Sequence, residues 1–511
     1  MSPVRSGEAG GDRPPGGEIS IEAVAEALAA AGLLVLRRGA LPARAAAITD
    51  DSRGVRPGSL FVAVRGSERD GHDFLEAVAR AGAECAIVED ETRTTLPALV
   101  VRDGRRAAAV AAAAAFGHPM RSLSLVGVTG TNGKTTTVGI LRHLLDEPGA
   151  RAASVGTLGV LVGSDGAPLE GGGGLTTPGP IELQRVLRAL VSAGVRTVAM
   201  EVSSHSLHQR RVEGARFDSA IFTNFTRDHL DYHATMDAYF AAKASLVGHL
   251  TPTGSAVVNS GDSAWRALPS AHRTIRFGVD DPAADVVAAG VRYGPSGSAW
   301  TLDIGGNRAP VALPLIGDFN VANALGAAAA AWSLGREVPV IAARLATLPQ
   351  VPGRLEIVHD RPTVLRDYAH TPDALERALD AVRPFARRRL IVVFGCGGDR
   401  DRGKRPLMGA IAEQRADHAI VTSDNPRTEN PERIIDEVIA GMTRDNHERV
   451  EDRRAAIAHA LEMADEDDVI VLAGKGHETY QIRGTERLPF DERAIVAELA
   501  GTRPVGRVAA R

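Results

Sequence analysis

The chain of 511 residues has few of the features typical of secreted, membrane-spanning or nucleic-acid-binding proteins. Its two cysteines, Cys85 and Cys396, are too few for a disulfide framework or a zinc cluster and fit a reducing compartment. No apolar run is long enough to span a bilayer. The 59 basic and 63 acidic residues give a net charge of −4, which predicts no bulk attraction to nucleic acid or anionic membranes.

The N-terminus also lacks a signal-peptide pattern. Residues 1–18 are polar and rich in glycine and proline, and we interpret them as a disordered leader. The composition, 44% hydrophobic and 24% charged, is ordinary for a globular protein, and the length suggests about three domains. We therefore expect a soluble cytoplasmic multidomain protein that binds no nucleic acid, inserts into no membrane and is a monomer.

The strongest motif is Val126-Gly-Val-Thr-Gly-Thr-Asn-Gly-Lys-Thr-Thr-Thr137. Apolar spacing predicts a buried strand before its glycines and a helix after them. A glycine turn at a helix N-terminus binds phosphate through backbone N–H groups and the helix dipole. Lys134 would reach the β- and γ-phosphates, and the Thr135 hydroxyl would ligate Mg²⁺. The match to the usual phosphate-binding motif is incomplete, because Val128 replaces its first glycine.

Polar residues downstream of this motif are further candidates. Glu201 ends a predicted strand, where a carboxylate could hold the Mg²⁺ of a nucleotide or simply cap a loop. His205 and His229 are either metal ligands or cap residues. Lys243 lies on a predicted amphipathic helix, where a solvated lysine is the ordinary interpretation. Asn320 begins an alanine-rich helix, either as its N-cap or as a hydrogen-bonding partner of adenine.

The order of predicted elements gives an α/β fold of three domains, at residues 19–103, 104–348 and 349–511. The first is a small α/β unit, in which Ser52 either holds a polar ligand or caps a turn. The second is a phosphate-loop domain with a mostly parallel sheet. In the third, strands and helices alternate regularly, which predicts a Rossmann-like, doubly wound parallel sheet.

Four polar loops follow strands of the third domain, at residues 367–370, 396–400, 423–427 and 474–478. Loops at the carboxyl edge of a parallel sheet line the ligand crevice. Arg400 and Arg427 would bind a carboxylate, whereas Asp424 and Glu478 would bind an ammonium group. This combination fits an amino-acid ligand, and surface ion pairs are the alternative.

Together these motifs resemble the ATP-dependent Mur ligases of peptidoglycan synthesis, over about residues 19–495. The resemblance rests on Gly130-Thr-Asn-Gly-Lys-Thr-Thr136, Glu201-Val-Ser-Ser-His205, Asn224-x-x-x-Asp-His-x-Asp231, Gly317-x-x-Asn320, Pro352-Gly-Arg354 and Asp367-Tyr-Ala-His370. Asp424-Asn-Pro-Arg427, with Gly474 and Glu478, resembles the diaminopimelate-adding branch, since lysine-adding relatives lack the Asn-Pro-Arg form. The family implies a UDP-binding domain, a central ATPase domain and a C-terminal domain that brings the amino acid.

The resemblance also implies a role for each matching residue. ATP would be bound by Gly130, Thr131, Asn132, Gly133, Lys134, Thr135, Thr136, Asn320, Arg354 and Asp367. The UDP-linked dipeptide would be bound by Ser52, Gly66, Ser67, Thr176, Thr177, Ser203, Gln209 and Arg211. Diaminopimelate would be bound by Arg400, Asp424, Asn425, Pro426, Arg427, Gly474 and Glu478. Magnesium would be held by Thr135, Glu201, His229 and Lys243, and the catalytic residues would be Lys134, His205 and Lys243.

The resemblance changes the interpretation of Lys243. The family carries an N-carboxylated lysine on this helix, and Lys243 lies 42 residues after Glu201. Nearby positive charge would disfavour its ammonium form, and the neutral amine could capture CO₂ to give a carbamate that ligates or orients magnesium. Asp50, Ser67 and Leu175 depart from the residues usual in the family's substrate loops.

The implied reaction is the addition of meso-diaminopimelate to UDP-MurNAc-L-Ala-D-Glu. The D-Glu carboxylate would attack the γ-phosphate of ATP, and the diaminopimelate amine would then displace phosphate from the acyl phosphate. Separate domains for ATP and the amine predict closure before chemistry. Other interpretations are addition of lysine or LL-diaminopimelate, a ligase like folylpolyglutamate synthase, and a nucleotide-regulated binding protein without ligase activity.

Overall fold

The computed structural model describes residues 17–66, 69–172 and 174–501. Ser67 and the first sixteen residues of the predicted leader lie outside this part of the chain. The chain forms two compact units. The first comprises residues 1–277, 283–286 and 326–337, and the second comprises residues 278–282, 287–325 and 338–511. The domain boundaries proposed from the sequence stay predictions.

The first unit begins with a five-stranded sheet in the order β2-β7-β6-β5-β4. These strands are β2 (Leu34–Arg38), β4 (Ala47–Thr49), β5 (Ser59–Val62), β6 (Ala83–Val88) and β7 (Ala98–Val101). Strands β4 to β7 are parallel, and β2 pairs antiparallel with β7. Alternating apolar residues pack one face against α1 (Ile21–Ala30) and α3 (Gly104–Ala115), and the other against α2 (Leu75–Arg80). Strands β1 (Ile19–Ser20) and β3 (Arg44–Ala45) form a separate pair.

The phosphate-loop strand β8 (Ser124–Thr129) lies inside the larger sheet of this unit, in the order β11-β10-β9-β12-β8-β13-β14-β15. The other strands are β9 (Arg151–Gly156), β10 (Gly159–Val162), β11 (Ala167–Leu169), β12 (Val195–Glu201), β13 (Phe217–Phe222), β14 (Leu250–Asn259) and β15 (Arg273–Val279). All run parallel to β8 except β10, which pairs antiparallel with both β9 and β11. The helices are α4 (Lys134–Leu145), α5 (Pro180–Ser192), α6 (Ser204–His208), α7 (Leu230–His233) and α8 (Met236–Ala244). Because β12 and β13 flank β8, the loops after all three strands meet at one edge.

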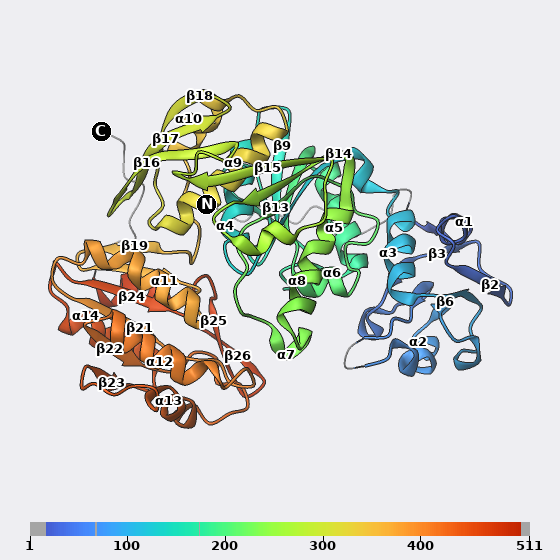
Figure 1. The fold of residues 1–511 in the computed structure, drawn as a ribbon. Coiled ribbons are helices and arrows are strands. Elements are labelled where there is room, and N and C mark those ends of the chain that lie inside the picture. The colour runs from blue at the N-terminus through green and yellow to red at the C-terminus, as the bar shows by residue number, and fades with distance from the viewer. Residues whose placement is uncertain (1–16, 67–68, 173, 502–511) are drawn as a thin grey trace. The chain divides into compact units, whose positions relative to one another are not determined.

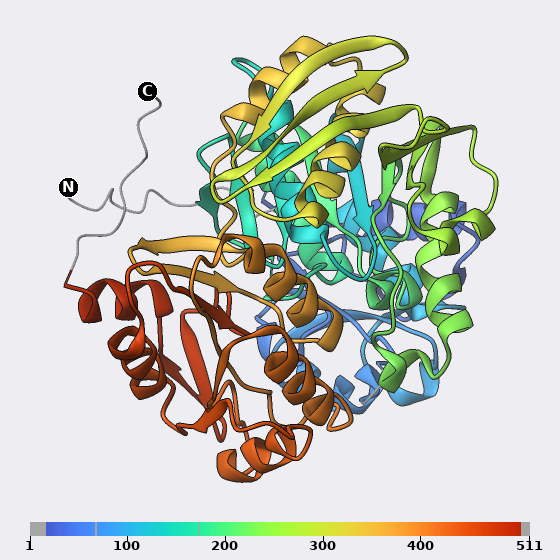
Figure 2. The ribbon, with the colours of Figure 1, turned by 60° about the vertical axis from the view of Figure 1, so that its left-hand side comes forward.

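The second unit contains a six-stranded sheet in the order β19-β20-β24-β21-β22-β23. Its strands are β19 (Glu356–Asp360), β20 (Thr363–Asp367), β21 (Leu390–Phe394), β22 (His418–Val421), β23 (His447–Arg449) and β24 (Val469–Ala473). All are parallel except β19. Helices α11 (Pro372–Val382), α12 (Lys404–Arg415) and α13 (Pro431–Ile439) pack on one face, and α14 (Arg453–Met463) and α15 (Glu492–Leu499) on the other (Figure 1, Figure 2).

This sheet confirms the predicted doubly wound α/β fold, and the four predicted polar loops follow β20, β21, β22 and β24 at one edge. The unit also contains β16 (Val286–Gly294), the antiparallel pair β17 (Gly297–Ile304) and β18 (Asn307–Leu313), and helix α10 (Val338–Ala346). Helix α9 (Asp318–Ser333) begins in this unit. Across the described ranges, no helix is long and apolar enough to cross a bilayer.

A fully buried ion pair joins α14 to α15. Arg453 donates to Glu492 at 2.8 Å and to the Ala473 carbonyl at 2.9 Å, and both charged side chains have no solvent exposure. Glu492→Ala should lower the free energy of unfolding by about 3–5 kcal/mol, because it leaves the buried guanidinium unpaired. The exposed pair Arg454–Glu498 joins the same helices, and Glu498→Ala should cost at most about 1 kcal/mol. Urea unfolding of both variants tests this, and equal losses would contradict it.

Candidate active site

Two glycines shape the loop after β8. Gly130 has a φ of 145°, and a Cβ there would lie 1.9 Å from the Thr223 hydroxyl. Gly133 caps α4 in the left-handed region, with a φ of 85°. Helix α4 therefore begins at Lys134, whose Nζ donates to the carbonyls of Gly130 and Thr131 at 2.8 Å each. The loop backbone packs closely against Thr223 and leads directly into the N-terminus of α4. A glycine loop followed by a helix N-terminus is the geometry of an anion site.

Residues after β13 hold this loop. The Asn132 N–H donates to the Asn224 side chain at 2.8 Å, and the Asn224 amide donates back to the Asn132 carbonyl at 3.1 Å. The Thr223 hydroxyl donates to the same carbonyl at 2.7 Å. Asn224 appeared in the sequence only as part of a family motif, and Thr223 was not predicted to have a role. Thr223 lies at this position only because β13 pairs with β8, and no local sequence pattern predicts its contact with the loop.

Lys243 lies beneath the phosphate loop and is only 1% exposed. Its Nζ donates to the Gly130 carbonyl at 2.7 Å and lies 4.5 Å from the centre of the Tyr239 ring. Burial, with the nearby charge of Lys134, lowers the pKa of Lys243 well below its usual value. The interpretation of Lys243 as a solvated lysine was therefore wrong. The helix that carries it ends at Ala244, and the environment favours a neutral amine.

Glu201 ends β12 beside the same loop and is 1% exposed. Its carboxylate accepts hydrogen bonds from the Thr157 N–H at 2.8 Å and the Thr157 hydroxyl at 3.3 Å. A Cβ at Gly156 would lie 2.2 Å from this carboxylate, so only glycine leaves room for it. Thr157 was not predicted from the sequence, because only the pairing of β9 with β12 brings it next to Glu201.

Predicted dipeptide-binding residues form one hydrogen-bonded cluster near Glu201. The Thr177 hydroxyl donates to the Glu201 carbonyl at 2.8 Å and accepts from the Ser203 N–H at 3.1 Å. Arg211 donates to the Thr177 carbonyl at 3.0 Å and to the Gln209 side chain at 2.9 Å. The remaining member is Thr176, whose hydroxyl accepts from the Thr157 hydroxyl at 3.2 Å. The structure thus brings together five of the eight residues assigned to this substrate.

The two predicted histidines face each other, with the ring centroids of His205 and His229 4.7 Å apart. Burial is the main cause that lowers the pKa of His205 to about 4, and the neighbouring His229 adds to it. Burial also lowers the pKa of His229, which precedes α7 in the left-handed region with a φ of 54°. Both imidazoles are therefore neutral near pH 7.

No cluster of three or more histidine, cysteine or acidic side chains in the described part of the chain is arranged to hold a metal ion. A nucleotide-bound magnesium ion needs fewer protein ligands than such a cluster provides, because it commonly binds one or two protein groups, the phosphates of the nucleotide and water. The buried Glu201 carboxylate at the strand end and the Thr135 hydroxyl in the first turn of α4 are groups of the required kind. These residues fit a magnesium ion carried by a nucleotide.

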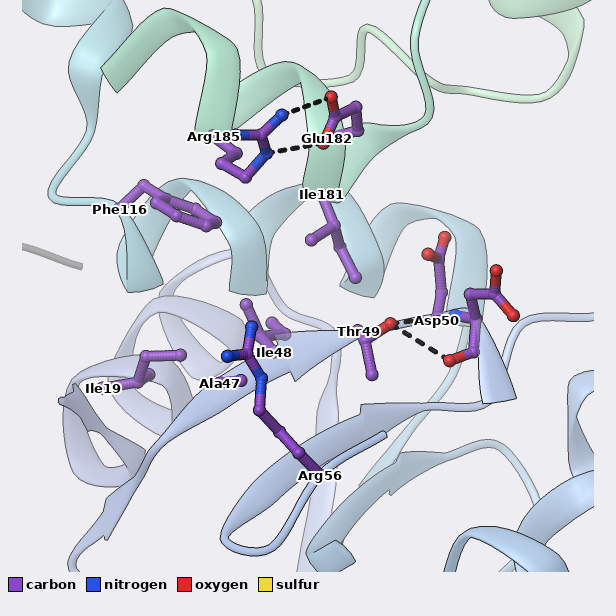
Figure 3. A pocket seen from close by; sticks show the side chains of 11 residues that line it. Ile19, Ala47, Ile48, Thr49, Asp50, Arg56, Phe116, Ile181, Glu182 and Arg185 are labelled. Carbon is purple, nitrogen blue, oxygen red and sulfur yellow. Dashed lines mark hydrogen bonds and ion pairs between the residues drawn. The ribbon is translucent and has the colours of Figure 1, made fainter. Parts of the chain in front are cut away.

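A cavity of about 320 Å³ lies between β4, the end of α3 and the start of α5 (Figure 3). Its apolar lining residues are Ile19, Ala47, Ile48, Phe116 and Ile181, and its polar ones are Thr49, Asp50, Asp51, Arg56, Glu182 and Arg185. Figure 3 shows the Glu182–Arg185 pair on α5 facing the end of β4. Ser52 follows this end in a short 3₁₀ helix, and its cap is Asp51, so the turn-cap interpretation of Ser52 was wrong.

The predicted amino-acid-binding loops of the second unit meet at the edge formed by β22 and β24. Asp424 packs so closely on Gly474 that a Cβ there would lie 2.4 Å from its carboxylate. Asn425 donates to Glu478 at 2.9 Å. Arg427 has a φ of 51° and donates to the Gly398 carbonyl at 2.8 Å. Burial, and then the charge of Arg400, lower the pKa of Arg427. Two guanidinium groups and two carboxylates therefore lie near one another at this edge of the sheet.

Three predicted nucleotide contacts also lie in the second unit. Arg354 stacks over the Tyr368 ring at 4.7 Å. Asp367 accepts from the Leu355 N–H at 2.7 Å, and loss of solvent raises its pKa. Asn320 donates from its side chain to the Ile316 carbonyl at 2.8 Å and lies inside α9, so its interpretation as an N-cap was wrong.

Three protein-family descriptions match the chain. They are the Mur ligase family, catalytic domain, at residues 45–124, the Mur ligase middle domain at residues 128–331, and the Mur ligase, glutamate ligase domain, at residues 353–476. The UDP-N-acetylmuramoyl-L-alanyl-D-glutamate–2,6-diaminopimelate ligase of Geobacillus kaustophilus (strain HTA426) is 44% identical over 461 residues. That alignment covers 88% of this chain and 93% of the relative.

A solved structure of a ligase with the same printed name has a TM-score of 0.62 and 33% identity, over 89% of this chain and 94% of that one. Folylpolyglutamate synthase of Mycobacterium tuberculosis, complexed with ADP and AMPPCP, has a TM-score of 0.61. It is 19% identical and covers 78% of this chain and 96% of that one, which is a likeness of fold alone. The identity to full-length relatives and the three matching domains show that the chain belongs to the Mur ligase family.

Proposed function

We propose that this Mur ligase adds meso-diaminopimelate to the D-Glu of UDP-MurNAc-L-Ala-D-Glu, using ATP, in the cytoplasmic stage of peptidoglycan synthesis. The observation that carries the proposal is the cluster of charged side chains formed by Asp424, Arg427 and Glu478. It offers cations and anions together, as the zwitterionic distal end of diaminopimelate requires. The names of relatives that are 44% identical over nearly their whole length support the same substrate.

The phosphate loop would bind ATP. Backbone N–H groups and the N-terminus of α4 would face the phosphates, and Lys134 would leave its two backbone carbonyls to reach the transferred phosphoryl group. Bound magnesium would neutralise phosphate charge, and Thr135, Glu201, His229 and carboxylated Lys243 are the groups we assign to hold it. The buried position of Lys243 under Gly130 supports its part in this assignment.

The cluster around Thr177 would hold the dipeptide. Arg211, with Thr176 and Ser203, would orient the D-Glu carboxylate toward ATP. One carboxylate oxygen attacks the γ-phosphorus, the bond to the β–γ bridging oxygen breaks, and an acyl phosphate and ADP result. Phosphorylation supplies the leaving group that a free carboxylate lacks. His205, a neutral imidazole here, is assigned to this step as a nearby polar group that adds no charge.

The second half of the reaction uses the amino-acid pocket. Arg427 and Arg400 would bind the distal carboxylate of diaminopimelate, and Asp424 and Glu478 its distal ammonium. The other amine, after losing a proton, attacks the acyl carbonyl, and the carbon–oxygen bond to phosphate breaks to leave an amide. We infer that the domains close before this step, which would exclude water from the acyl phosphate.

The uridine diphosphate end would lie on the N-terminal sheet. We assign it to Gly66, Ser67 and Ser52, the last of which follows the end of β4 that lines the cavity. The apolar side chains that line the cavity suit a planar ring, and the polar ones among them offer hydrogen-bond partners (Figure 3). We also infer that the enzyme acts as a monomer, because each assigned role falls on a residue of one chain.

Two other functions are less well supported. A folylpolyglutamate synthase shares only the fold, at 19% identity. A nucleotide-regulated binding protein would not need both Lys134 and Lys243 on the Gly130 carbonyl together with a buried Glu201. Phosphate release that requires the UDP-linked dipeptide and an amino acid together separates these possibilities.

An amino-acid panel tests the substrate. Phosphate release should require ATP, the UDP-linked dipeptide and meso-diaminopimelate, and lysine or LL-diaminopimelate should be poor replacements. Arg427→Ala should raise the KM for meso-diaminopimelate by roughly 30-fold or more, because the distal carboxylate loses its partner. The weak reaction with lysine should not change, since lysine has no such carboxylate. Arg433→Ala, on the exposed side of α13, is the control. Equal use of lysine by the wild type would contradict the proposed substrate.

Chemical rescue tests the state of Lys243. Lys243→Ala should lower kcat by roughly 100-fold or more, because a group near the transferred phosphate is lost. If the native group is a carbamate, formate or acetate should restore part of the activity by entering the space as a carboxylate. Methylamine should restore none. Thermal melting of the variant controls for folding. Rescue by methylamine alone would show that an ammonium is the active form.

A further inference from the structure

At the carboxyl edge of the six-stranded sheet, Lys475 is the one fully buried cation in the described part of the chain that contacts the predicted amino-acid-binding residues. Its side chain has no solvent exposure. Its Nζ lies 3.1 Å from the Asn425 side-chain oxygen, 3.1 Å from the Glu478 carboxylate and 3.9 Å from that of Asp424. One ammonium group therefore contacts three of the residues assigned to diaminopimelate. Neither the motifs nor the family resemblance assigned it a role.

The composition makes a lysine at this position notable. Of the 59 lysines and arginines in the chain, only four are lysine: Lys134, Lys243, Lys404 and Lys475. The other 55 (59 minus 4) are arginine. An ammonium differs from a guanidinium in being a compact point charge with three donors, which suits a small enclosed space between several acceptors. The surroundings of Lys475 are such a space.

Lys475 also determines how its neighbours present their polar atoms. The Asn425 oxygen accepts from Lys475 and from the Ile482 N–H at 2.9 Å, so the Asn425 amide nitrogen is directed at Glu478. Glu478 in turn receives hydrogen bonds from Asn425 and Lys475 on the same oxygen, which leaves its other oxygen for a ligand. Lys475 and the Ile482 N–H together fix the amide orientation of Asn425, and Lys475 and Asn425 together fix the carboxylate of Glu478.

The charges of the pocket explain why a buried cation is needed. Lys475 contacts the carboxylates of both Asp424 and Glu478, so two carboxylates share one cation. Two formal negative charges and one positive charge leave a formal charge of −1, which favours an ammonium group on the ligand. The nearby guanidinium groups of Arg400 and Arg427 then remain for a ligand carboxylate.

We propose that Lys475 is a positioning residue that holds Asp424, Asn425 and Glu478 in the arrangement that recognises an ammonium and a carboxylate on one carbon. It acts through these neighbours and does not touch the ligand. The inference rests on the proposed function, because it takes the amino acid to bind at this edge. It goes beyond the proposed function because it assigns part of the discrimination between diaminopimelate and lysine to Lys475, which lies behind the residues that would contact the ligand.

Steady-state kinetics of Lys475→Met test the proposal. The KM for meso-diaminopimelate should rise by roughly 10- to 100-fold, because two carboxylates lose their shared partner. The KM for the UDP-linked dipeptide should stay within about twofold, because its assigned residues lie in the first unit. The KM for ATP should rise less than that for diaminopimelate, because the contacts of Lys475 are to residues assigned to the amino acid. Lys475→Gln keeps a hydrogen-bond donor, so its KM for meso-diaminopimelate should also rise, but by less. The glutamine variant still tests the proposal if the methionine variant does not fold.

A double-mutant cycle separates positioning from general support of the fold. In Glu478→Gln the partner of Lys475 is already neutral, so adding Lys475→Met should raise the KM for diaminopimelate by far less than it does in the wild type. Arg389→Met is the matched control. Arg389 pairs with the buried Asp468 at 2.7 Å at the opposite end of β24. That variant should lose thermal stability without changing the KM for diaminopimelate.

The possible outcomes distinguish this inference from the proposed function. A wild-type enzyme that does not use diaminopimelate overturns the proposed function. A wild type that uses it, with Lys475→Met showing an unchanged KM for it, overturns only the role of Lys475. An equal rise in all three KM values, or fully independent effects in the double mutant, would show that Lys475 supports the fold and nothing more specific.

Discussion

Two lysine side chains donate to the same backbone carbonyl, that of Gly130, and much of the central site depends on this arrangement. Lys134 and Lys243 each approach that oxygen to within 2.8 Å. Two ammonium ions so close repel each other, and Lys243 has no solvent to screen its charge. Burial and the nearby charge of Lys134 therefore lower the pKa of Lys243 and favour its neutral form. A neutral buried amine beside a phosphate site can become a carboxylate by taking up CO₂.

The loop itself is held in place from both neighbouring strands. On one side, Thr223 and Asn224 fix the backbone of Asn132 from the end of β13. On the other, β12 delivers Glu201 to the same edge. Parallel strands present their carboxyl ends together, so a short glycine loop obtains rigid partners without any long insertion. The site is preorganised because its supports are strands and not mobile segments.

Much of this could be predicted from the sequence, because the relevant signals are local. The phosphate loop, the strand ending at Glu201 and the alternating elements after residue 349 all follow from spacing and turn residues, and the structure confirms the α/β fold that they predict. The family resemblance, confirmed by the three domain matches, was needed to single out Lys243, whose local pattern indicates only a surface helix. The individual binding roles stay predictions.

The residues that could not be predicted share a physical reason. Thr157 and Thr223 contact groups that are distant in sequence and that meet only when the strands pair. Lys475 lies in a predicted loop, but its contacts with Asn425 and Asp424 become visible only in the folded sheet. Such supporting residues face inward and satisfy other polar groups, so their identity depends on the fold being known. In the proposed zwitterion site this dependence is strong, because each ligand charge needs an opposite charge on the protein. The single charge of Lys475 is shared by two carboxylates, so the proposed arrangement would keep a negative charge for the ligand ammonium.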